Sequence, residues 1–72
     1  MATILTINGK TPVIHPSAFI AENAVIAGQV FIGERANIWY GAVLRADQGF
    51  DIRIGDKSSI QDNSVIHTSH IN

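Results

Sequence analysis

The residues best suited to chemistry in this sequence are one histidine, His67, and a short polar run that precedes it. The imidazole of His67 can ligate a metal ion or act as a general base. The run Arg45-Ala46-Asp47-Gln48 adds a guanidinium and a carboxylate. The chain has no cysteine, so it offers neither a thiolate metal ligand nor a thiol nucleophile. Without further context, each of these side chains is equally well explained as an ordinary solvated surface residue.

The element that must position these residues is a ladder of branched aliphatic side chains with a period of six. This period matches neither the 3.6 of an α-helix nor a simple alternating strand. It fits a short strand plus a turn, repeated, which is the hexapeptide signature of a parallel β-helix. The alternative is a β meander with a chance run of isoleucines, but two blocks of rungs, each with the same period of six, favour the β-helix. The rungs are Ile14, Ile20, Ile26, Ile32, Ile38, Leu44, Ile54, Ile60 and Ile66.

Three hexapeptides make one triangular coil, so every third rung lies on the same face of a prism. The residues beside each rung point outward, because side chains alternate along a strand. The face of Ile26, Leu44 and Ile66 then presents a column of valines beside a column that includes Arg45 and His67. An outward valine stripe is either incidental or a partner surface, and the neighbouring arginine and histidine favour a partner surface. The two columns are Val25, Val43 and Val65, and Ala27, Arg45 and His67.

The sequence predicts a single β-helix domain over residues 1–72. Residues 1–12 are expected to form an N-terminal cap, a strand over 3–7 that ends at the turn Asn8-Gly9. Residues 13–72 are expected to form about three coils. A loop insertion is predicted at 45–53, because Leu44 and Ile54 are ten positions apart instead of six. The chain stops inside a coil, so we expect it to be truncated at its C-terminal end.

Composition and charge argue against several classes of function. The formal net charge of −1 gives no electrostatic basis for binding nucleic acid or a membrane surface. No apolar run reaches about 18 residues, so no segment is expected to span a membrane. The start of the chain lacks the charged and apolar regions of a signal peptide. We therefore expect a cytoplasmic protein, or one carried to an organelle by a sequence outside this chain.

Three clusters of residues together resemble the γ-class carbonic anhydrases and their carbonic-anhydrase-like relatives. Hexapeptides alone are shared with acyltransferases, whereas Arg45-x-Asp47 followed by Gln61-Asp62-Asn63 and then His67 is more specific. The resemblance implies an all-β, left-handed parallel β-helix that assembles as a homotrimer. It also implies a lyase that hydrates carbon dioxide to bicarbonate at a zinc or iron ion held between subunits. The clusters are Asn37 to Asp47, Ile54 to Asn63, and Val65 to His67.

The resemblance implies a role for each matched position. His67 matches the first of the family's three metal-binding histidines. Arg45 and Asp47 match an ion pair between subunits that orders the site. Gln61 matches the residue that hydrogen-bonds the metal-bound water or hydroxide, and Asp62 matches a polar position that supports the subunit contact. The valine column would then belong to the same subunit interface.

The chain departs from the family pattern in two places. The position after Asp47 holds a proton-shuttling glutamate in well-studied members, but here it is Gln48, which does not titrate. The family takes its second and third histidines from later coils, so the chain alone is expected to hold metal weakly and to be inactive. His70 is not expected to replace them, because three residues along a strand place it opposite His67. His15 is expected on another face.

The chemistry of the family explains this choice of residues. A catalytic zinc site has three protein ligands and an open position for water, whose pKa the ion lowers to about 7. The resulting hydroxide attacks carbon dioxide, and an amide such as Gln61 can orient it. Two other functions stay open. One is a hexapeptide acyltransferase with His67 as base and a coenzyme A groove between subunits. The other is a non-catalytic trimeric assembly module, consistent with Gln48 and the missing histidines.

Overall fold

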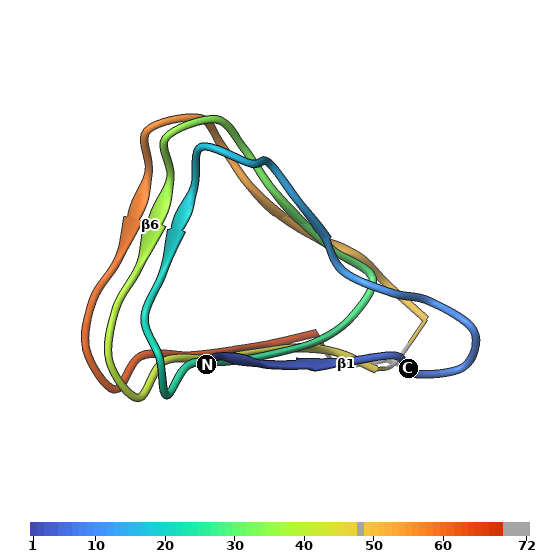
Figure 1. Ribbon diagram of the computed structural model, residues 1–72. Helices are drawn as coiled ribbons and strands as arrows, with labels where there is room; N and C mark the ends of the chain where they lie inside the picture. Colours follow the sequence, from blue (N-terminus) through green and yellow to red (C-terminus); the bar gives the residue numbers. More distant parts are fainter. Residues whose placement is uncertain (48, 69–72) are drawn as a thin grey trace.

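The computed structural model describes residues 1–47 and 49–68, which coil into a prism with a triangular outline (Figure 1). Gln48, His70 and Asn72 lie outside the described residues. The named strands form three parallel sheets, in the orders β1-β4-β7-β10, β2-β5-β8 and β3-β6-β9. No helix capable of crossing a membrane occurs in the described part of the chain. The predicted fold class is confirmed: the chain is a left-handed parallel β-helix.

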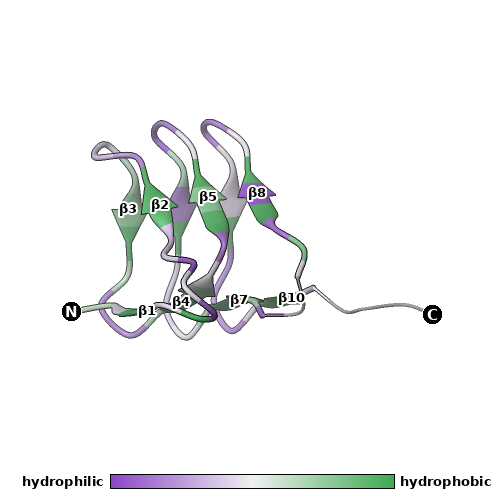
Figure 2. Ribbon diagram, turned by 90° about the vertical axis from the view of Figure 1, so that its right-hand side faces the viewer, coloured by the Kyte–Doolittle hydropathy of each residue, from purple (hydrophilic) through white to green (hydrophobic). Residues whose placement is uncertain are grey.

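The strands are short because each side of the prism holds about one hexapeptide. Seen from the side, strands of successive coils lie next to one another (Figure 2). The first face contains β2 (Val13–Ile14), β5 (Val30–Ile32) and β8 (Ile52–Ile54). The second contains β3 (Phe19–Ile20), β6 (Asn37–Ile38) and β9 (Ser59–Ile60). The third contains β1 (Thr3–Leu5), β4 (Val25–Gly28), β7 (Val43–Ala46) and β10 (Val65–His67).

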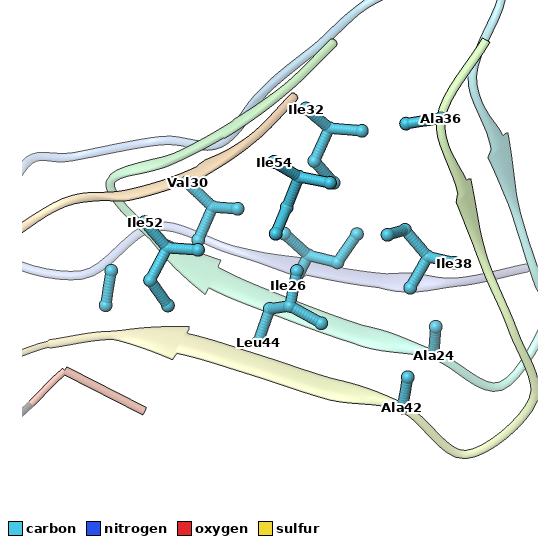
Figure 3. Packing of buried hydrophobic residues seen from close by; sticks show 11 residues of the cluster. Ala24, Ile26, Val30, Ile32, Ala36, Ile38, Ala42, Leu44, Ile52 and Ile54 are labelled. Carbon is cyan, nitrogen blue, oxygen red and sulfur yellow. The ribbon is translucent and has the colours of Figure 1, made fainter. Parts of the chain in front are cut away.

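The core consists of the predicted ladder, with alanines filling positions where the chain turns. Ile26, Ile38 and Leu44 come from the second and third faces and are all completely buried. Their side chains meet those of Ile32 and Ile54 in one interior (Figure 3). Burying a side chain of this size stabilises the fold by roughly 1.5–3 kcal/mol. The rungs of the outermost described coils are only partly buried, because no further coil covers them: Ile14, Ile20, Ile60 and Ile66.

The register of the third face agrees with the predicted columns. Val25, Val43 and Val65 are aligned across β4, β7 and β10. Arg45 lies directly beside His67 on the adjacent strand. Ala27, predicted to point outward in the same column, is only 2% exposed, between its aligned neighbours Leu5 and Arg45.

The N-terminal segment adds a rung that the period of six does not reveal. β1 pairs with β4 in parallel, with Ile4 aligned with Ile26, and it ends at Leu5, two residues short of the predicted strand over 3–7, because Ile7 pairs instead with Lys10 across the turn. Beyond β1 the chain turns at Asn8 and Gly9, which both have positive φ, and Ile7 and Lys10 exchange two backbone hydrogen bonds of 2.9 Å. Positive φ at both central residues is the geometry of a type I′ turn, so the predicted turn is present.

The loop between β7 and β8 is narrower than the predicted insertion at 45–53. β7 continues to Ala46, which pairs with Gly28, and β8 begins at Ile52, which pairs with Val30. Ala46 and Ile52 are both buried. The insertion is therefore confined to residues 47–51, because the apolar residues on either side of it are drawn into the core.

Candidate functional site

His67 contacts a carboxylate of its own chain. His67 is the last residue of β10, and its Nε2 lies 2.8 Å from Oδ1 of Asp47. An ionised carboxylate only accepts hydrogen bonds, so Nε2 is the donor. Sequence reasoning brought Arg45 and His67 together but did not pair His67 with Asp47.

The same carboxylate also meets Arg45. Nε of Arg45 lies 3.4 Å from Oδ2 of Asp47, so the two oxygens face different partners. Asp47 is the most shielded of the three, with 17% of its side chain exposed, against 28% for His67 and 49% for Arg45. Arg45 and Asp47 thus form an ion pair within one chain, whereas the predicted pair was one between subunits, which stays a prediction. We call these three residues the Arg–Asp–His cluster.

Strand register explains why the cluster forms. β7 and β10 are parallel neighbours, so outward residues 22 positions apart, Arg45 and His67, stand side by side. Asp47 follows Arg45 by two positions, so its side chain points to the same outer face of the sheet. β7 can run this far because residue 28 on the adjoining strand is a glycine, whose φ is 82°. A Cβ at that position would overlap the carbonyl oxygen of Ala46.

The other two predicted polar residues lie elsewhere. Gln61 and Asp62 occupy the turn between β9 and β10, and both are exposed. This turn precedes β10, whereas His67 ends it. Within residues 1–47 and 49–68, no hydrogen bond joins the side chain of Gln61 or Asp62 to the cluster. One chain therefore does not bring these two residues to His67.

The valine column borders the cluster on the third face. Val25 and Val43 are half-buried, while Val65 at the last described coil is 69% exposed. The valine column lies two residues before the Arg45–His67 column along each strand, and the inward-facing Leu44 and Ile66 rungs stand between the two columns. An apolar strip and an ionic cluster thus share one face of the prism.

The donor atoms available for a metal ion are few. Among the described residues there is no group of three histidines and carboxylates that could hold one. The cluster offers one imidazole and one carboxylate, and a three-ligand zinc site needs more. The described residues alone therefore do not provide the ligands of a complete metal site. Any metal at His67 would need ligands from elsewhere.

Several hollows flank the described part of the prism, and sequence reasoning identified none of them. One, of about 100 Å³, is lined by Asn8 and Lys10 from one loop and by Asp47 and Phe50 from another. Both loops leave the same corner of the triangle (Figure 1). The sequence feature that could have revealed these two loops is the spacing of the aliphatic rungs. Ile4 and Ile14, like Leu44 and Ile54, are ten residues apart instead of six.

The second hollow, of about 380 Å³, lies on the first face and is lined in part by Phe31, Arg53 and His15. Nε2 of His15 is 3.9 Å from Oε1 of Glu34. His15 is therefore on a different face from His67, as predicted.

Comparison with known proteins gives several relatives, although no protein-family profile matches the chain. It is 40% identical over 70 residues to "Gamma carbonic anhydrase 3, mitochondrial" of Arabidopsis thaliana, covering 97% of this chain and 27% of the relative. It is 52% identical over 58 residues to "Uncharacterized transferase YtoA" of Bacillus subtilis, covering 81% of this chain and 33% of the relative.

Among solved structures, a hexapeptide transferase family protein from Anaplasma phagocytophilum superposes with a TM-score of 0.69 at 34% identity. The match covers 90% of this chain and 50% of that one. The chain spans only about a quarter to a third of the length of the two curated relatives.

Proposed function

Since the chain is a hexapeptide β-helix protein related to the γ-class carbonic anhydrases and to transferase-like proteins, we propose that it contributes part of a carbonic anhydrase site. The substrates would be carbon dioxide and bicarbonate. The observation that carries this proposal is the convergence of Arg45, Asp47 and His67 beside the valine column. These residue types at this spacing distinguish the γ-class pattern from hexapeptides in general.

The proposed cofactor is zinc or iron, with His67 as the ligand that this chain contributes. The remaining ligands would come from a neighbouring subunit or from residues outside the described part of the chain. When bound, such an ion makes water acidic near neutral pH and so supplies hydroxide for hydration. Gln61 would orient the reacting water by a hydrogen bond, from a subunit other than the one that supplies His67.

The proposed assembly is a homotrimer that packs through the third face. The valines would be buried at the contact, with Asp62 at its edge. Asp47 holds Arg45 within the chain, but half of the arginine side chain remains exposed. It is therefore accessible to a carboxylate of a neighbouring subunit, such as Asp62. Assembly would in this way bring Gln61 and Asp62 to the cluster, which a single chain does not do.

The interface predicts that Val65→Glu disrupts assembly without unfolding the chain. Val65 is 69% exposed in the single chain, so a glutamate there costs little until a partner buries it. We expect sedimentation velocity to show mainly monomers and circular dichroism to show an unchanged melting temperature. Val13→Glu is the matched control, because Val13 is also an exposed valine, but on the first face. Equal assembly of both variants would contradict a third-face interface.

The activity is tested by stopped-flow hydration of carbon dioxide with assembled protein in which the remaining metal ligands are present and the site is loaded with metal. We expect His67→Ala to reduce the rate by at least roughly 100-fold, because it removes a metal ligand. His15→Ala should leave the rate unchanged, since His15 lies on the first face. If His67→Ala hydrates carbon dioxide as fast as the unmodified protein, the proposed function is wrong.

A second candidate is an acyltransferase, because the Bacillus relative and the Anaplasma structure are both named as transferases. In that function His67 would act as a general base, and Asp47 would orient its ring. Calorimetric titration with coenzyme A separates the two functions: saturable binding by metal-free protein favours the transferase. A protein that binds neither metal nor coenzyme A would instead favour a non-catalytic assembly module.

A further inference from the structure

The hollow on the first face lies between a column of large side chains and a floor of glycines. Val13, Phe31 and Arg53 are aligned across β2, β5 and β8, which lie side by side (Figure 2). The residues that follow β5 and β8 are both glycines, Gly33 and Gly55. Because a glycine has no side chain, the outer surface is recessed there, and a hollow of about 380 Å³ results. This volume is within the range of sites that bind small molecules.

One wall of the hollow carries a guanidinium that is held in place. The guanidinium carbon of Arg53 lies 4.3 Å from the centre of the Phe31 ring, and its Nε donates a hydrogen bond of 2.8 Å to Oδ2 of Asp51. Within residues 1–47 and 49–68, its two Nη atoms donate no hydrogen bond. The side chain is 71% exposed, so these atoms are accessible to a ligand. A planar guanidinium held in this way is suited to bind a carboxylate through two hydrogen bonds.

The floor of the hollow carries a carboxylate. Oδ1 of Asp56 accepts a hydrogen bond of 2.9 Å from the backbone nitrogen of Glu34, and a Cβ at Gly33 would overlap that oxygen. The carboxylate of Asp56 therefore lies directly over the backbone of Gly33, and its Oδ2 accepts no hydrogen bond within the described residues. The side chain of Glu34 lines the same hollow. Because Asp51 already neutralises Arg53, the remaining charge of the hollow is negative and favours a cationic group on its floor.

The two charged groups are close enough for one small molecule to meet both. Phe31 and Gly33 are two residues apart, so the guanidinium over the ring and the carboxylate over the glycine are separated by roughly 7 Å. We propose that the hollow binds a free α-amino acid with an apolar side chain. Arg53 binds its carboxylate, Asp56 binds its ammonium group, and its side chain packs against Val13, which is 57% exposed. This site lies on the first face and is independent of the proposed carbonic anhydrase site on the third.

The ligand class is tested by titrating the purified chain with leucine and following backbone amide resonances. We expect saturable binding of leucine. Leucinamide lacks the carboxylate and N-acetylleucine lacks the ammonium group, so each should bind at least roughly 10-fold more weakly. Alanine should also bind more weakly, because its side chain is too short to cover the valine. The proposal is overturned if any of these three compounds binds as tightly as leucine, or if leucine shows no saturable binding up to roughly 10 mM.

The residues are tested with Asp56→Asn and Arg53→Gln. An asparagine oxygen can still accept the hydrogen bond from Glu34, so Asp56→Asn removes the charge and keeps the turn. We expect each variant to bind leucine roughly 10-fold or more weakly, with circular dichroism unchanged. Asp56→Asn should also lose its preference for leucine over N-acetylleucine, which a merely structural effect would not produce.

Glu22→Gln and Arg35→Gln are the matched controls for the two changes of charge. Glu22 pairs with the amino terminus at 3.5 Å, and Arg35 lies in the turn between β5 and β6. Both control variants should bind leucine like the unmodified chain. If Asp56→Asn and Arg53→Gln bind leucine as tightly as these controls, the hollow is not the binding site and the proposal is wrong.

Discussion

Replacing Ile38 with aspartate will unfold the chain at 25 °C. Ile38 is completely buried, between the aligned rungs Ile20 and Ile60. A carboxylate there has no partner, and burial of an unpaired charge belongs to the changes that cost more than about 4 kcal/mol. A chain of 72 residues has a total stability of only about 4–11 kcal/mol. We expect the β-sheet circular dichroism and the cooperative melting transition both to be lost.

Asn37→Asp is the control, because it places the same carboxylate one residue away on the outer surface. Oδ1 of Asn37 already accepts a hydrogen bond of 2.8 Å from Nε1 of Trp39, and an aspartate oxygen can accept it too. We expect this variant to melt close to the unmodified chain. If Ile38→Asp melts at the same temperature as Asn37→Asp, the rungs do not point into the prism.

Gly28→Ala should destabilise the chain by about 3 kcal/mol or more. The φ of 82° at Gly28 costs an alanine about 1–2 kcal/mol. The added Cβ would also overlap the carbonyl oxygen of Ala46, which is backbone of the neighbouring strand. Relieving that overlap requires β4 and β7 to separate at this end. Because Asp47 follows Ala46, the same shift should loosen the contact between Asp47 and His67.

Gly9→Ala is the control that measures the cost of the backbone conformation without the steric overlap. Gly9 has a similar φ of 75°, but a Cβ there would meet no atom within 4 Å. Urea unfolding of both variants should show Gly9→Ala losing about 1–2 kcal/mol, the conformational cost alone. Equal losses in the two variants would show that Gly28 is not needed for the approach of β7 to β4.

Much of the fold follows from the sequence because its period is simple. Rungs such as Leu44 and Ile66 repeat often enough to give both the faces and the register of their neighbours. Ile4 was placed in the predicted cap strand but was not recognised as a rung of the ladder, because it stands alone before a ten-residue interval where no period can be seen. Ala46 and Ile52 were assigned to a loop because polar neighbours surround them. Their burial depends on strands that are distant in sequence.

The candidate site was predictable only in part. The pairing of Arg45 with His67 follows directly from the register. The contact of Asp47 with His67 does not, because it depends on how far β7 extends, and that depends on Gly28 in a different coil. Gln61 and Asp62 are where the ladder places them, at a turn. In the proposed trimer they would reach His67 from a second subunit, an arrangement that the sequence of one chain indicates only through resemblance.

The central claim is that His67 is one ligand of a metal site whose other ligands come from elsewhere. The most direct test is the zinc content of the purified 72-residue chain, measured by mass spectrometry after zinc loading and dialysis. The account predicts well below one ion per chain, because the Arg–Asp–His cluster offers one imidazole and one carboxylate and the described residues hold no group of three ligands. Near-stoichiometric zinc that disappears in His67→Ala would contradict the account. The first residues to examine would then be His15 and His70, the latter outside the described residues.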